Sequence, residues 1–173
     1  MPSNCPAIAQ AYSKKCRDAQ GGVQKFYVTE HANIASYTEA SGVLTAITMV
    51  AGKKFWLYEQ ELNTANFTET PTPNRQAGTN FTEMAFVSKL LKRDAATSYS
   101  LRALGQQDLV IIEVEQTGTA FICGIKNGMA LEPSPSGTGT NMGDESAYNL
   151  TFKGQEPYPA FTISQALIDS VIV

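Results

Sequence analysis

The chain has 173 residues and a mass of 18.7 kDa, which is the size of one domain, and 43% of its residues are hydrophobic. With 13 Lys and Arg against 16 Asp and Glu, this composition excludes a disordered chain and a strongly basic nucleic-acid-binding protein. Only 17% of the residues are charged, below the roughly 25% usual in soluble domains, so we expect partners to cover part of the surface.

Membrane and metal sites are not expected. No segment approaches the roughly 20 apolar residues that span a bilayer, and the first residues lack the apolar stretch of a signal peptide, which predicts synthesis in the cytoplasm and no membrane partner. Cys5, Cys16 and Cys123 are too few for a disulfide framework, and Cys5 and Cys16 lack the spacing of a zinc knuckle. We expect no metal or cofactor, and Cys123 is predicted to be a small buried residue on a strand.

The chain reads as a single domain, residues 1–173, with an N-terminal arm at 1–20 and a β-rich body at 21–173. The arm is short of large apolar residues. β-branched and aromatic runs predict strands at 23–29, 44–50, 53–61, 65–70, 108–115, 119–125, 146–153 and part of 160–163. The run at 81–91 fits either a strand or a helix, and a strand is preferred.

Three pairs of these strands are predicted to form hairpins: 53–61 with 65–70, 108–115 with 119–125, and 146–153 with 160–163. The strand at 53–61 is apolar on both faces, which indicates a sandwich or a covering subunit. Residues 71–79 contain two prolines and are predicted to be a loop long enough to reach a neighbour, and 133–143 is predicted to be a second loop.

One helix is expected at 94–105, where Asp94 is the N-cap, Leu101 and Leu104 lie on one stripe, and Gly105 ends the helix. The tail, 166–173, is too apolar to remain in water. The fold class predicted from these elements is mainly β: an antiparallel β-sandwich or barrel with one flanking α-helix and extended loops.

No set of residues meets the spacing that catalysis requires. The glycines at 137, 139 and 143 do not match a dinucleotide-binding or phosphate-binding loop, and no serine occupies a nucleophile elbow. The pairs Glu59 and Glu61, and Glu113 and Glu115, are each two residues apart on a predicted strand, so each pair shares a face. Their ordinary interpretation is a solvated outer face, with Val110, Ile112 and Val114 toward the core. We therefore expect a protein that is not an enzyme.

The acidic pairs have a second interpretation if copies of the sheet close into a ring. Outward carboxylates would then line a channel and repel a passing polyanion. Glu113, Glu115, Glu59 and Glu61 are the candidate lumen-facing residues under this hypothesis.

Several short motifs occur in an order that resembles virion structural proteins of tailed bacteriophages, most closely the tail tube proteins. They are Cys16–Val23 before the first strand, Asp108–Glu115 before a tight turn, Gly124 and Gly128, Gly137–Thr140, Gly143-Asp144, and Tyr148–Gly154. The resemblance covers most of the chain. It implies β-sheets with a flanking helix, homo-oligomeric rings that stack into a tube, passage of DNA through the lumen, and no catalytic residues.

The function expected from this resemblance is self-assembly into the tail tube, in the tail of the virion, with other tail or neck proteins as further partners. Ring contacts join two different patches of each subunit, which suits an arm and a loop that dock on a neighbour. The candidate residues for contacts between subunits are Cys5, Tyr12 and Arg17 in the arm, and Pro73, Arg75 and Asn80 in the loop.

Two alternatives remain open. One is a neck, head-to-tail or head-decoration component, which would stay monomeric or form one closed ring. The other is a carbohydrate-binding β-sandwich, in which Phe55, Trp56, Tyr58 and Tyr148 would be stacking platforms. Burial of these aromatic residues in the sheet core is the simpler interpretation.

Overall fold

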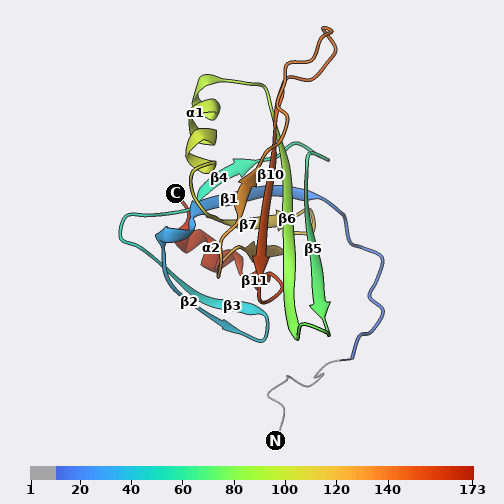
Figure 1. The fold of residues 1–173 in the computed structure, drawn as a ribbon, viewed down its shortest axis with the longest axis vertical. Coiled ribbons are helices and arrows are strands. Elements are labelled where there is room, and N and C mark those ends of the chain that lie inside the picture. Colours follow the sequence, from blue (N-terminus) through green and yellow to red (C-terminus); the bar gives the residue numbers. More distant parts are fainter. Residues whose placement is uncertain (1–10) are drawn as a thin grey trace, which may run out of the picture.

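The computed structural model describes residues 11–173 and places the body in two packed β-sheets (Figure 1). The seven-stranded sheet has the order β2-β3-β11-β8-β7-β1-β4, and the four-stranded sheet has the order β5-β6-β10-β9. All pairings are antiparallel except that of β11 with β3. The predicted mainly β sandwich is confirmed, and neither sheet closes into a barrel.

The strands of the seven-stranded sheet are β1 (Val23–Glu30), β2 (Ile34–Ala40), β3 (Val43–Met49), β4 (Trp56–Glu59), β7 (Leu109–Glu115), β8 (Ala120–Cys123) and β11 (Phe161–Ile163). Those of the four-stranded sheet are β5 (Ala65–Asn74), β6 (Thr79–Leu91), β9 (Ala130–Glu132) and β10 (Ala147–Glu156). A short 3-10 helix, η1 (His31–Asn33), connects β1 to β2. The two α-helices are α1 (Ala95–Leu104) and α2 (Gln165–Val171).

The seven-stranded sheet is covered on both faces. Along β7, Val110, Ile112 and Val114 point into a cluster that α2 completes, whereas Leu109 and Ile111 point into a second cluster between the sheets. Six of the seven residues of β7 are therefore buried. A strand that is covered on both sides has a nearly continuous apolar sequence, because neither face is in contact with water.

Each α-helix is capped by a side chain at its N-terminus and packs apolar residues against one of the two clusters. α1 begins at the predicted N-cap, where the Asp94 carboxylate accepts a hydrogen bond of 2.6 Å from the Thr97 amide, and Leu101 and Leu104 pack toward the cluster between the sheets. α2 was not predicted, although the burial of the apolar tail was; Ile168 and Val171 are buried. No helix within residues 11–173 has the length and apolar character that crossing a bilayer requires.

Of the three predicted hairpins, only the one formed by β7 and β8 is confirmed. β4 pairs with β1 in the seven-stranded sheet, whereas β5 pairs with β6 in the four-stranded sheet, so the connection at residues 60–64 passes between sheets. β10 and β11 likewise lie in different sheets. Local alternation identified these strands but carries no information about which partner each strand has.

Residues 71–79 were wrongly predicted as a loop. β5 continues through Pro71 and Pro73 to Asn74, and the turn covers residues 75–78. Proline cannot donate a hydrogen bond to a ladder, but β5 is an edge strand that pairs on one side only, so the missing donors leave no partner unsatisfied. The strand preference at 81–91 is confirmed by β6, and β2 was not predicted.

Candidate assembly surfaces

The four-stranded sheet presents one face that neither hydrophobic cluster uses, which we call the open face. Alternation and register define it, because Met84, Phe86 and Phe152 point inward to the cluster between the sheets. Except for Ala147 at the start of β10, none of the residues at these alternate positions is buried. Its residues are Asn66, Thr68, Thr70 and Thr72 on β5; Phe81, Glu83, Ala85, Val87 and Lys89 on β6; Asn149, Thr151, Lys153 and Gln155 on β10; and Ala130 and Glu132 on β9.

The open face is polar, and its charges balance. Two glutamates, Glu83 and Glu132, accompany two lysines, Lys89 and Lys153. Lys89 forms a 2.7 Å ion pair with Glu145 in the loop before β10, so its charge is partly neutralised. The remaining residues are mostly threonine and asparagine, which are short and neutral.

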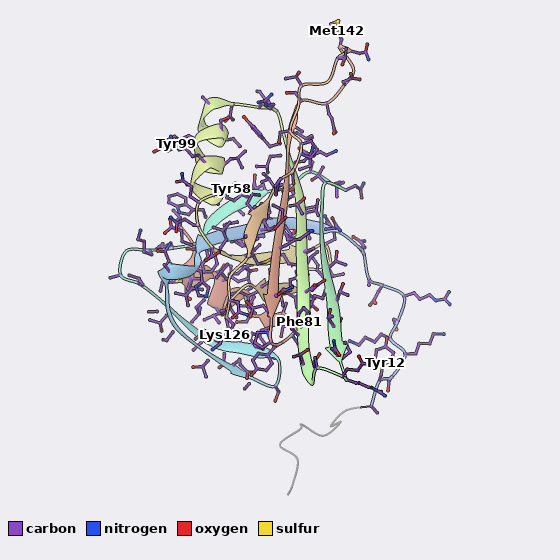
Figure 2. The ribbon with its side chains drawn as sticks, in the orientation of Figure 1. Tyr12, Tyr58, Phe81, Tyr99, Lys126 and Met142 are labelled. Carbon is purple, nitrogen blue, oxygen red and sulfur yellow. The ribbon has the colours of Figure 1, made fainter. Side chains whose placement is uncertain are left out.

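A groove of about 1200 Å³ lies between β4, α1 and the last residues of β6, and Lys89 belongs both to its lining and to the open face. It forms where the cluster between the sheets is only partly covered: Tyr58 stacks on Phe26 with ring centroids 5.0 Å apart, yet Tyr58 itself is half-buried. The rims of the groove carry Trp56, 62% exposed, and Tyr99, 77% exposed. Figure 2 shows Tyr58 on β4 and Tyr99 on α1 at this end of the molecule.

The predicted position of Glu113 is wrong, because its side chain is 1% exposed and lies between the sheets. The alternation that placed it outward assumed that β7 has one wet face, but both faces are covered. Its Oε2 atom has no hydrogen-bond partner, and burial, followed by the nearby Glu115 and Glu69 carboxylates, raises its pKa to about 8. A protonated carboxyl in this position cannot line a channel.

The other three acidic candidates occupy two separate places. Glu115 is half-buried at the end of β7, where it accepts a 3.0 Å hydrogen bond from the Thr117 hydroxyl. Glu59 and Glu61 are exposed and line the groove beside β4, although Glu61 lies beyond the end of the strand. The four residues therefore do not share a surface.

The predicted subunit-contact residues that the structure describes are all exposed. Tyr12 is 86% exposed, Arg17 lies in the same extended segment, and Arg75 is in the turn between β5 and β6. Pro73 and Asn80 face one another across that hairpin, and Tyr12 lies at the same end of the molecule (Figure 2). Cys5 lies outside the described residues. The role of these residues between subunits stays a prediction.

The aromatic residues considered for glycan stacking do not form one platform. Phe55 is 0% exposed and Tyr148 is 5% exposed, and the Tyr148 hydroxyl donates a hydrogen bond to the Asp94 carbonyl. Trp56 alone is largely exposed. Cys123 is buried on β8, as predicted, and burial raises the pKa of its thiol.

The ordered tip of the loop at 133–146 was not predicted from the sequence. The Asp144 carboxylate accepts 2.7 Å hydrogen bonds from the amides of Thr140 and Asn141, and these bonds lower its pKa. This arrangement leaves Met142 fully exposed at the tip, where the loop projects beyond the rest of the body (Figure 2). An aspartate three residues after an asparagine was the available signal, since such pairs favour local side-chain to backbone bonds.

Comparison with known proteins assigns no family. No protein-family model, no curated protein and no solved structure matches this chain. Within residues 11–173, no group of three His, Cys, Asp or Glu side chains is placed to hold a metal ion. The function is therefore argued from the surfaces.

Proposed function

We propose that this chain is a structural virion protein that assembles into stacked rings and forms the tail tube of a bacteriophage, a conduit for DNA during ejection. The observation that carries this proposal is the open face, a whole sheet face that the chain leaves uncovered. Copies placed side by side would join their open faces into the inner wall of a ring. The motif resemblance supports the same function.

The chemistry of the open face suits a passage for DNA. Proteins hold DNA mainly through lysine and arginine contacts to phosphates, and each contact adds to a strongly salt-dependent affinity. On the open face, two lysines stand against two glutamates, and Lys89 already has a partner in Glu145. Short neutral side chains such as Thr68 and Thr151 offer little to a phosphate backbone. DNA would move past such a wall without being retained.

This proposal changes which residues face the lumen. Glu83 and Glu132 on the open face replace Glu113 and Glu115, whose side chains lie between the sheets or at their edge. Glu59 and Glu61 lie at the groove and would contact a neighbour or solvent. The arm and the β5–β6 hairpin lie at one end of the body, so they form a patch distinct from the groove (Figure 1). Two distinct patches are what a closed head-to-tail ring requires.

Negative-stain electron microscopy of the purified protein, with light scattering over a concentration series, tests this proposal. We expect hollow tubes of uniform diameter whose length grows with protein concentration. A protein that stays monomeric, or that stops at one closed ring, would contradict the tube and favour a neck or head-decoration component.

The exposed Trp56 is the one observation that favours the carbohydrate-binding alternative. Since it is the only tryptophan in the chain, its fluorescence reports directly on the groove. Titration with a panel of soluble glycans should leave its emission unchanged if the groove serves assembly. A saturable shift in emission would favour glycan binding.

A further inference from the structure

The groove beside β4 exposes apolar side chains at the edge of the cluster between the sheets. Tyr58, Leu90 and Leu104 pack against the cluster between the sheets but remain only partly buried, and Trp56 and Tyr99 stand exposed at the rims. Each exposed aromatic residue represents apolar area that a partner can remove from water. The groove therefore has the composition of an interface centre, in which aromatic residues are enriched.

We infer that this groove receives the N-terminal arm, residues 11–20, of a second copy of the chain. The inference rests on the proposed function, since it supplies the contact between neighbouring subunits.

Charge complementarity selects the arm as the occupant. The carboxylates that line the groove are Glu30, Glu59, Glu61 and Asp94, whereas its lysines are Lys25, Lys89 and Lys92. Lys89 is already paired with Glu145, so carboxylates outnumber the remaining lysines. Residues 11–20 carry the opposite balance, with Lys14, Lys15 and Arg17 against Asp18. Opposite charges at a rim guide association and fix the orientation of the docked segment.

Another exposed segment with an apolar side chain is the loop that presents Met142. Its tip carries Asp144 and Glu145, so it would place carboxylates beside those of the groove. Like charges at close range oppose docking. The arm offers both an exposed aromatic residue, Tyr12, and cationic neighbours, and it is the better match.

The backbone of β4 offers a further means of holding an extended segment. β4 is the edge of the seven-stranded sheet, and its four residues pair with β1 in an unbroken register. It contains no proline, bulge or lysine, although it is only four residues long and ends in Glu59. β5, the corresponding edge of the other sheet, carries Pro71 and Pro73. An extended arm can add to the β4 edge as a further strand.

The position of the arm favours exchange between copies. It leaves the body on the β5 side, away from α1 (Figure 1), and Tyr12 reaches the turn end of the β5–β6 hairpin (Figure 2). Ten extended residues span roughly 35 Å, which is enough to cross to an adjacent subunit. The arm on one side and the groove on the other form a head-to-tail contact, which continues from copy to copy until a ring closes.

Disulfide trapping between two proteins that each carry one introduced cysteine, with the native Cys123 remaining buried on β8, tests the contact. Tyr12→Cys in one protein and Tyr99→Cys in the other are prepared with Cys5→Ser and Cys16→Ser, mixed and oxidised. Since each chain holds one of the two introduced thiols, a 12-to-99 bond identified by mass spectrometry forms only between chains. Tyr158→Cys is the matched control, because Tyr158 is also an exposed tyrosine, 57% exposed, but lies outside the groove.

We expect the 12-to-99 disulfide to exceed the 12-to-158 disulfide by at least about fivefold, an effective-concentration effect of docking. Equal yields would overturn the inference. So would a chain carrying both Tyr12→Cys and Tyr99→Cys that forms only an internal disulfide, since the arm would then fill its own groove.

Electron microscopy of the wild-type protein separates this inference from the proposed function. If tubes form but the 12-to-99 disulfide shows no excess, arm docking in the groove is contradicted and the tail tube proposal is kept. If the 12-to-99 disulfide is strong but the protein forms only dimers or one closed ring, arm docking is supported and the tail tube proposal is contradicted. A monomer with no excess disulfide would remove both.

A charge exchange provides a second, independent readout. Glu59→Lys with Glu61→Lys, and separately Lys14→Glu with Lys15→Glu, should each raise the protein concentration needed for assembly roughly tenfold, as measured by light scattering. An equal mixture of the two variants should recover part of the loss, because each arm then meets a complementary groove, and one chain carrying all four substitutions should assemble within about twofold of wild type. If the chain with all four substitutions instead needs a concentration raised by the product of the two separate effects, the arm-to-groove contact is contradicted.

Discussion

The two sheets differ in how many of their faces the chain itself covers. The seven-stranded sheet has a cluster on each face, one completed by α2 and one shared with the four-stranded sheet, whereas the four-stranded sheet is covered on its inner face alone. The sheet that is covered twice is the structural frame, and burial there constrains almost every residue of β7. The sheet that is covered once keeps alternate positions free for contact with something outside the chain.

The largest effect expected from this difference comes from neighbouring residues of β6. Phe86 is 0% exposed on the inner face, so Phe86→Ala should lower the free energy of unfolding by about 3–5 kcal/mol. Val87→Ala, on the open face, is the control and should cost less than about 1 kcal/mol in the isolated subunit. Chemical denaturation measures both. Equal costs would mean that the two faces of this sheet are equally covered.

The next effect concerns Glu113 and the pH dependence of stability. Its pKa rises from 4.5 to about 8 on folding, so the folded state keeps a proton that the unfolded chain releases. The free energy of unfolding should therefore fall as pH rises from about 4.5 to about 8, by a few kcal/mol, and level off above that range. Urea denaturation across this range measures the slope.

Glu113→Gln should remove most of that slope, since glutamine does not titrate. A smaller slope should remain, because burial also raises the pKa of Glu156. Glu132→Gln, on the open face, is the control and should leave the slope nearly intact, because Glu132 is not among the carboxylates that raise the pKa of Glu113. If Glu113→Gln leaves the pH dependence of the free energy of unfolding unchanged, the Glu113 carboxyl is exposed to water rather than buried.

A smaller effect is expected at the helix that covers the outer face of the seven-stranded sheet. The Ser164 hydroxyl caps α2 by accepting a 3.3 Å hydrogen bond from the Leu167 amide. Ser164→Ala should cost about 1 kcal/mol in thermal or chemical denaturation, the usual value of a lost N-cap. Ser170→Ala, in the last turn of the same helix, should cost less; the reverse order would argue against the cap.

The smallest effect on stability is expected on the open face. Thr151→Lys should change the free energy of unfolding by less than about 0.5 kcal/mol, because the side chain meets no cluster. In assembled tubes the same change should increase DNA retention and steepen its salt dependence. Thr48→Lys, exposed on β3 in the other sheet, is the matched control. Equal DNA retention by both variants would remove the open face from the lumen.

The sequence predicts local structure well and pairing poorly. The β7–β8 hairpin, the Asp94 cap and the burial of the apolar tail follow from turn chemistry, capping and hydrophobicity, all of which act between near neighbours. The partners of β4, β5, β10 and β11 depend on contacts between residues far apart in the chain. Alternating hydrophobicity marks these strands but does not specify to which sheet they belong.

The same limit explains the misplaced Glu113. A glutamate between Ile112 and Val114 on a strand ordinarily indicates a wet face, and only the second sheet packed over β7 reverses that interpretation. The open face could not be recognised either, since its threonines and asparagines resemble those of any solvated strand. By contrast, the exposure of Tyr12, Arg17 and Arg75 follows from the polar, proline-bearing segments that hold them.

The central position of β11 has a consequence for the order in which the molecule forms. β11 joins two groups of strands, β2-β3 and β8-β7-β1-β4, through three residues that are translated after every other strand. The growing chain can form each group early, but it cannot unite them until residues 161–163 have left the ribosome. Completion of the frame is thus timed by synthesis.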